Sequence, residues 1–242
     1  MTFDEWVISR LIAHGLYTGR GDGAPGRAMS RGIEAFQKLN GLPVTGLANE
    51  ATVDLLRQAP RNNSIVVGIP AKSVDIPPEP VWMREARRYM GLREIAGPKS
   101  NPTILGWAAR LGGWVASFYK NDDTPWCGLA VAAWISVTLP REVIPSNPLG
   151  ALNWSKFGRP LKVPSVGAIL TFRREGGGHV GLYVGEDETH FHVLGGNQSN
   201  SVSITRIDKE RLAAIRWPLT GGDPVGGRVD LSAYGEVSRN EA

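Results

Sequence analysis

The chain contains one cysteine, Cys127, in the stretch DTPWCGLAVAAWI that covers residues 123–135. A cysteine thiolate is a strong nucleophile, but a lone cysteine among apolar residues is more often an inert part of a core. Asp123 or Thr124 can cap a helix here, and Pro125 suits its first position. Cys127 then falls in the first turn, where the helix N-terminus favours the thiolate. Cys127 is therefore a candidate nucleophile, with an inert buried thiol as the alternative.

A thiolate nucleophile needs a general base, which is most often histidine. The chain has four histidines, at positions 14, 179, 190 and 192. His179 follows three glycines and begins the run HVGLYVG, in which strand alternation puts His179 and Gly181 on one face and the apolar residues on the other. The glycine leaves room beside the imidazole for another element or a substrate. His179 is the candidate base, with a strand-end histidine on a half-wet sheet as the alternative; we expect His14 to be structural or exposed.

A third polar group commonly orients the imidazole of such a pair. Two candidates follow His179 in the sequence: His192 in THFHV and Asn197 in LGGNQSNSV. A second imidazole or an amide oxygen can accept the ring N–H, although asparagine in a glycine-rich turn is more often a turn former. The residue types alone leave both candidates open.

The elements that must position these residues divide the chain into four parts. Residues 1–60 repeat apolar side chains at helical spacing and predict a small helical unit. Residues 61–80 contain four prolines and no clear period, which is typical of a semi-rigid linker. Residues 81–220 have helical patterns first and short β runs later, which predicts an α+β domain. Residues 221–242 are polar and rich in glycine, and we interpret them as a C-terminal tail.

Within these parts the elements are expected at definite positions. In the second helix of the helical unit, Ser30 is the expected N-cap and Gly41 the C-cap, with Ile33, Phe36 and Leu39 on the buried face. The larger domain is expected to have helices at 80–90, 100–113 and 124–139, and strands at 168–172, 179–184, 190–194 and 201–207.

Composition narrows the function classes. One cysteine excludes an intramolecular disulfide framework and a cysteine-rich zinc site. No apolar run approaches the roughly 20 residues of a membrane span. Asp4, Glu5 and Arg10 make the N-terminus unlike a secretory signal, so we expect synthesis in the cytoplasm and release by another route.

The charge distribution bears on the partner. Residues 81–220 carry 17 Lys and Arg against 11 Asp and Glu, which favours an anionic partner such as a cell wall or nucleic acid. No basic stretch alternates with aromatic residues as nucleic-acid platforms do, and the Gly-rich runs lack the Lys and Ser/Thr of a P-loop. We therefore expect no nucleic acid as partner.

The ordered set PWC, GGGHVG and GGNQ resembles the CHAP and NlpC-type cysteine amidohydrolases and peptidases, especially phage-type endolysin domains, over roughly residues 94–217. The resemblance implies a papain-like fold, with helices packed on an antiparallel sheet. It also implies that Cys127 is the nucleophile, His179 the base and Asn197 the residue that orients the base. NlpC-type members often use a second histidine instead, which would assign that role to His192; the GGNQ match favours Asn197.

The N-terminal stretch LYTGRGDGAPG, followed by SRGIEAFQKLNGLPVTGLANEATVDLL, resembles a three-helix peptidoglycan-binding domain. Some relatives of that domain carry zinc, but with only His14 available we expect none. The resemblance of this stretch and that of residues 94–217 both point to peptidoglycan, and together they imply a peptidoglycan hydrolase of the endolysin type. Such an enzyme would cleave an amide bond of the peptide stem or of its muramoyl linkage.

The same two resemblances imply further properties. We expect a monomer that needs no metal or cofactor and does not insert into membranes. It would be made in the host cytoplasm and act on the wall or in the periplasm after release. Loops such as residues 147–160 are expected to line the pocket and to decide which amide is cut. The alternatives are a toxin-type peptidoglycan amidase, delivered to competing cells, and a non-enzymatic wall-binding or virion protein.

Overall fold

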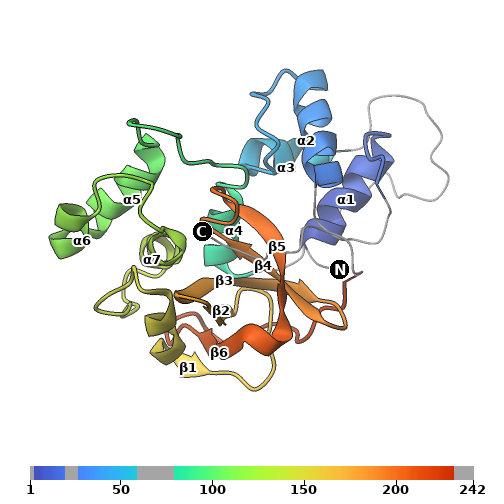
Figure 1. The fold of residues 1–242 in the computed structure, drawn as a ribbon. Coiled ribbons are helices and arrows are strands. Elements are labelled where there is room, and N and C mark those ends of the chain that lie inside the picture. Colours follow the sequence, from blue (N-terminus) through green and yellow to red (C-terminus); the bar gives the residue numbers. More distant parts are fainter. Residues whose placement is uncertain (1–2, 20–26, 59–78, 232–242) are drawn as a thin grey trace. The chain divides into compact units, whose positions relative to one another are not determined.

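The chain forms two compact units, Met1–Glu79 and Pro80–Ala242. The computed structural model describes residues 3–19, 27–58 and 79–231 (Figure 1). Most of the predicted linker, residues 61–78, lies outside the described residues, as does the end of the predicted tail, residues 232–242.

The described part of the first unit contains three helices: α1 (Phe3–Ala13), α2 (Arg27–Leu39) and α3 (Glu50–Leu56). Apolar side chains from all three meet in one core, which includes Trp6, Phe36 and Leu56. Helical spacing of the apolar residues places them on facing sides of the three helices. The predicted small helical unit is therefore present.

Two details of helix α2 differ from the sequence prediction. The helix begins at Arg27, so Ser30 lies inside it and is not the N-cap. Leu39 is 73% exposed and does not share the buried face of Ile33 and Phe36, because it ends the helix beyond the core. Gly41 follows with φ 66°, the left-handed conformation that glycine adopts readily after a helix, as predicted.

The second unit is an α+β domain with an antiparallel six-stranded sheet (Figure 1). Its helices are α4 (Val81–Arg87), α5 (Pro102–Leu111), α6 (Gly113–Phe118) and α7 (Cys127–Thr138), with short 3-10 turns η1 (Ala151–Lys156) and η2 (Lys209–Arg211). The strands are β1 (Arg159–Pro160), β2 (Ile169–Arg174), β3 (Gly177–Glu186), β4 (His190–Gly195), β5 (Ser203–Asp208) and β6 (Leu212–Trp217). They lie in the order β1-β6-β2-β3-β4-β5, so β2 and β3 are central.

The four expected strands correspond to β2, β3, β4 and β5, whereas β1 and β6 were not predicted. Strand β6 returns from the end of the sequence to pair with β2, and β1 pairs with β6 at the edge. Strand β1 is only Arg159–Pro160, too short for any pattern. Strand β6 is half-buried along most of its length, so its sequence lacks a clear apolar alternation.

Helix α7 is the buried centre of the domain. Every residue from Cys127 to Ile135 is buried, and the helix packs against α4, α5, β3 and β4. Trp107 of α5 packs against two tryptophans of this segment, with its ring centroid 6.0 Å from that of Trp134 in α7 and 6.1 Å from that of Trp126 at the helix start. This packing fixes the position of the helix start.

The start of α7 differs from the expectation. The helix begins at Cys127, with Trp126 as the N-cap residue, and no side chain caps it. Thr124 lies outside the helix because Asn121 closes a turn around it: Asn121 Oδ1 accepts hydrogen bonds from the Thr124 N–H and Oγ1. Cys127 still lies in the first turn, although neither Asp123 nor Thr124 caps the helix.

The described start of the predicted tail belongs to the domain. Asp230 forms a parallel bridge with Glu186, and the Leu231 N–H donates to the Glu186 carbonyl at 2.7 Å. The domain therefore extends at least to Leu231, beyond the predicted boundary at residue 220. No helix among the described residues is long and apolar enough to cross a membrane.

Candidate active site

Cys127 and the strand that carries His179 meet at the N-terminus of α7. The Cys127 side chain is buried, with 6% of its surface exposed. Burial raises the pKa of the thiol, whereas backbone N–H groups of Val180 and Gly128 and the charge of Arg174 lower it. Val180 follows His179 directly, so the same part of β3 carries the histidine and an N–H that reaches the thiol.

His179 is fully buried on β3, opposite Phe172 of β2. Its Nε2 atom lies 3.1 Å from the Oε1 atom of Gln198. An amide oxygen can only accept a hydrogen bond, so this contact assigns the ring proton to Nε2. In the neutral ring, Nδ1 is then the basic nitrogen. The contact thus fixes both the orientation and the tautomer that a general base requires.

Gln198 is itself held firmly. Its side chain is fully buried, and its Nε2 atom donates to the carbonyls of Ser203 at 2.6 Å and Val193 at 3.2 Å. Because the amide nitrogen faces these two carbonyls, the amide oxygen faces His179. The neighbouring strands β4 and β5 therefore position the group that orients the imidazole.

Gln198 occupies the position that the motif GGNQ led us to expect for Asn197. The backbone at Asn197 is left-handed, with φ 56°, a conformation that asparagine tolerates better than most residues. This turn directs the following side chain, that of Gln198, toward His179. Asn197 is therefore the turn-forming residue and Gln198 the contacting one. The motif located the element correctly, but the sequence alone did not show which of its two amides faces the ring.

The two glycines of this motif allow the close approach. A Cβ atom at Gly195 would lie 3.0 Å from His179 Nε2 and 2.9 Å from Gln198 Oε1. A Cβ atom at Gly196 would lie 2.6 Å from the ring of Trp126, the residue before Cys127. Gly195 at the end of β4 therefore lies against the His179–Gln198 pair, and Gly196 lies against Trp126 at the start of α7, and neither position has room for a side chain.

A loop between α7 and β2 forms a wall of the site. A Cβ atom at Gly128 would lie 2.3 Å from the carbonyl oxygen of Pro148, and one at Gly178 would lie 2.6 Å from Cγ of Leu152. These glycines are next to Cys127 and His179 in the chain, so the loop borders both residues. Leu152 is 40% exposed. The expectation that residues 147–160 line the pocket stays a prediction.

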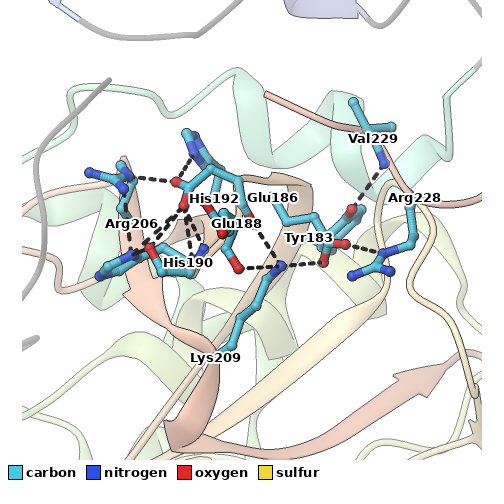
Figure 2. Close-up of polar contacts among 11 residues, drawn as sticks. Tyr183, Glu186, Glu188, His190, His192, Arg206, Lys209, Arg228 and Val229 are labelled. Carbon is cyan, nitrogen blue, oxygen red and sulfur yellow. Dashed lines mark hydrogen bonds and ion pairs between the residues drawn. The ribbon is translucent and has the colours of Figure 1, made fainter. Parts of the chain in front are cut away.

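His192 belongs to a different polar cluster. Its Nε2 atom lies 3.0 Å from Oδ2 of Asp187, and Arg206 Nε donates to the same oxygen at 2.7 Å (Figure 2). His192 pairs with Gly185, six residues along β3 from His179. At about 3.3 Å per strand residue, about 20 Å of strand separates the two positions. The structure therefore does not bring His192 to His179.

The cluster around Asp187 ties several segments together. Asp187 is 8% exposed, and its Oδ1 atom accepts the N–H groups of Thr189 and His190. Burial by itself raises the pKa of Asp187, but hydrogen bonds from Arg206, Thr189 and His192 outweigh it and hold that pKa well below its usual value. Burial also lowers the pKa of His192, so its ring is neutral near pH 7 and donates to the carboxylate. Sequence analysis did not identify Asp187 or Arg206, which only pairing of β3, β4 and β5 brings together.

A second carboxylate anchors the end of the domain. Glu186 is buried and forms ion pairs with Arg228 and, at 3.7 Å, with Lys209 (Figure 2). The hydroxyl of Tyr183 accepts the Val229 N–H at 3.0 Å. These contacts explain why residues 228–231 are held against β3. They define a structural cluster, separate from the residues around Cys127.

The residues around Cys127 define a candidate nucleophilic site. Cys127 supplies a buried thiol at a helix start, His179 an imidazole with an assigned tautomer, and Gln198 the amide that orients it. No group of three or more His, Cys, Asp or Glu within the described ranges could hold a metal ion.

Comparison with known families concerns the first unit. Residues 5–56 match the model of the family described as "Putative peptidoglycan binding domain". This match supports an N-terminal peptidoglycan-binding domain and association with the cell wall. Searches of curated proteins and of solved structures gave no match.

Proposed function

We propose that this protein is a peptidoglycan hydrolase, in which the second unit cleaves an amide bond of the peptide stem or of its muramoyl linkage. The observation that carries the proposal is the contact of His179 with Gln198. His179 lies on the stretch of β3 whose next residue, Val180, directs its N–H to the Cys127 thiol. Cysteine hydrolases of papain-like fold use the same three roles. The peptidoglycan-binding family match supports the choice of polymer.

In the proposed reaction, His179 Nδ1 takes the proton of the Cys127 thiol. The thiolate attacks the carbonyl carbon of the amide, and a C–S bond forms as the carbonyl oxygen becomes an oxyanion. Backbone N–H groups in the first turn of α7 have no intrahelical partner and stabilise that oxyanion. His179 then donates its proton to the leaving nitrogen, the C–N bond breaks, and a thioester remains.

Water completes the cycle. His179 removes a proton from the water molecule, which attacks the thioester carbonyl, and the C–S bond breaks to release a carboxylic acid. Gln198 keeps the imidazole oriented and keeps the proton on Nε2 throughout. These steps use only residues of this chain.

The buried state of Cys127 has a consequence for the resting enzyme. Burial raises the pKa of the thiol, so the protonated thiol is the resting form unless His179 accepts the proton. The proposal therefore makes His179 necessary for forming the nucleophile as well as for protonating the leaving group.

The first unit contributes by keeping the enzyme on its insoluble substrate. Once it is bound to the wall, the linked second unit meets stem peptides at a raised effective concentration. Removing the first unit should therefore reduce the rate on intact walls more than the rate on soluble muropeptides.

Cys127→Ala tests the proposal most directly. We expect complete loss of turbidity decrease with purified walls, because no other thiol can replace Cys127. Binding to the same walls, measured by cosedimentation, should be unchanged. Mass spectrometry of wild-type digests identifies the cleaved bond from the new amine. Lysis by the Cys127→Ala variant would overturn the mechanism.

A second candidate is a non-enzymatic wall-binding protein, favoured by the fact that the matched family is a binding family. Wild-type protein that binds walls and releases no new amine would establish this candidate in place of the hydrolase.

A further inference from the structure

The tip of the β2–β3 hairpin carries two arginines beside the candidate site. Arg174 pairs with Gly177, and Phe172 pairs with His179. Residues directly opposite in an antiparallel pair share a face, and faces alternate along each strand. Arg174 and Gly177 therefore lie on the same face of the hairpin as His179. Arg173 lies on the opposite face.

The two faces of the hairpin differ in the space they leave. A Cβ atom at Gly177 would meet nothing within 4 Å, so the position beside Arg174 is open. On the other face, a Cβ atom at Gly178 would collide with Leu152. A group from outside can therefore approach the His179 face at Gly177, whereas Leu152 covers the opposite face at Gly178.

Arg174 also acts electrostatically on the nucleophile. Its positive charge lowers the pKa of Cys127, in opposition to burial. Arg174 is half-buried, and a charge in that setting is screened less than an exposed one. The charge of Arg174 therefore acts at the thiol from the hairpin face that also carries His179.

We propose that Arg174 binds a carboxylate of the substrate next to the reacting carbonyl, and that Gly177 leaves the space by which this carboxylate reaches the guanidinium. The inference rests on the proposed hydrolase function for the identity of the substrate. Peptide stems of peptidoglycan carry carboxylates, and the planar guanidinium matches a carboxylate with two parallel hydrogen bonds. Arg174 is thus a specificity-determining residue for acidic stems.

The test compares two alkylating reagents that differ only in charge near the reactive carbon. Iodoacetate carries a carboxylate and iodoacetamide a neutral amide; each forms an S–C bond with Cys127 and releases iodide. Because the chain has one cysteine, mass spectrometry of the full-length protein reports that reaction alone. The ratio of the iodoacetate rate to the iodoacetamide rate measures carboxylate recognition, since changes in thiol reactivity affect both reagents.

We expect Arg174→Gln to lower this ratio about tenfold, the lower end of the range for loss of hydrogen bonding to a charged group. Arg173→Gln removes the same charge from the opposite face and should leave the ratio unchanged. Arg174→Lys keeps the charge and should restore part of it. An unchanged ratio in Arg174→Gln, or an equal fall in Arg173→Gln, would overturn the inference.

The reagent test does not depend on hydrolysis, so it separates the two proposals. If wild-type protein releases no amine from walls but the ratio behaves as expected, the hydrolase proposal fails and the carboxylate site stands. If walls are cleaved, the inference also predicts a KM about tenfold higher for Arg174→Gln on acidic muropeptides than for wild type. Muropeptides with that carboxylate amidated should show no such difference.

Discussion

His179 and His192 lie on neighbouring strands of one sheet, and both are buried, yet their surroundings differ in kind. His179 contacts a neutral amide, Gln198, and lies on the strand segment that reaches a thiol. His192 contacts a carboxylate, Asp187, that Arg206 also binds. The neutral Gln198 amide orients the His179 ring and leaves its other nitrogen able to accept and return a proton. The Asp187 carboxylate is already paired with Arg206, and the His192 ring serves it as one more hydrogen-bond donor. The nearby thiol, and a partner that no arginine shares, distinguish the candidate catalytic histidine from the structural one.

The largest expected difference between the two histidines is in turnover. His179→Ala should lower kcat on soluble muropeptides by about three orders of magnitude or more, because both the activation of the thiol and the protonation of the leaving group are lost. His192→Ala should retain the kcat of wild type per folded molecule. Release of new amino groups measures both. Equal losses in the two variants would contradict different roles for the two histidines.

The orienting amide should have the next largest effect. Gln198→Ala should lower kcat about 10- to 100-fold, the range expected for loss of a hydrogen bond to a group that becomes charged. Asn197→Gly is the matched control, because glycine keeps the left-handed turn while removing the amide. That variant should keep nearly full activity. If Asn197→Gly were inactive and Gln198→Ala active, the assignment of the amide would be reversed.

For His192 the expected effect is on stability. Replacing it with alanine leaves the buried Asp187 with one fewer donor and opens a small cavity, which should cost about 2–4 kcal/mol of unfolding free energy. Hydrogen exchange of peptides from β3 and β4 should accelerate in His192→Ala, whereas Gln198→Ala should leave the β3–β4 end near Asp187 protected. Unchanged protection in His192→Ala would show that the Asp187 cluster does not stabilise the domain.

The smallest expected effect is a pH dependence that belongs to the Asp187 cluster. The pKa of Asp187 in the folded protein lies below its ordinary value of 3.8. A lowered folded pKa means that the unfolded chain binds the proton first, so this stability is present above about pH 4 and lost as the pH falls below it. Urea unfolding at pH 5, 4 and 3 should show a steeper loss for wild type than for Asp187→Asn. Parallel slopes would contradict the assignment.

Local sequence predicted much of the fold. Helix α5 lies within the predicted range 100–113, with Asn101 as its cap and Pro102 in its first turn, because capping depends on neighbours in the chain. Strands β2 to β5 were expected from β runs bounded by turn residues. Strand β6 and the packing of residues 228–231 were missed, because both depend on pairing with distant strands.

The candidate site was likewise predicted in part from local sequence. The motif PWC placed Cys127 in the first turn of a helix even though the expected cap was wrong, because buried apolar residues after it define the helix. Gly181 was expected to leave room beside the imidazole for another element or a substrate, and Val193 of β4 occupies that space, because a Cβ atom at Gly181 would lie 2.5 Å from its Cγ1 atom. The choice between Asn197, Gln198 and His192 could not be made from residue types, since all three can accept or donate a hydrogen bond.

The sequence by itself determined the candidate nucleophile and base, the α+β class and the N-terminal peptidoglycan-binding unit, because each depends on residue identity and short-range spacing. Tertiary structure alone decided which polar side chain faces His179. A left-handed turn at Asn197 and the carbonyls of β4 and β5 direct Gln198 to the ring, and strand register places His192 at the other end of β3. Strand register and turn direction depend on contacts between distant segments, so they could not be predicted from the order of residues.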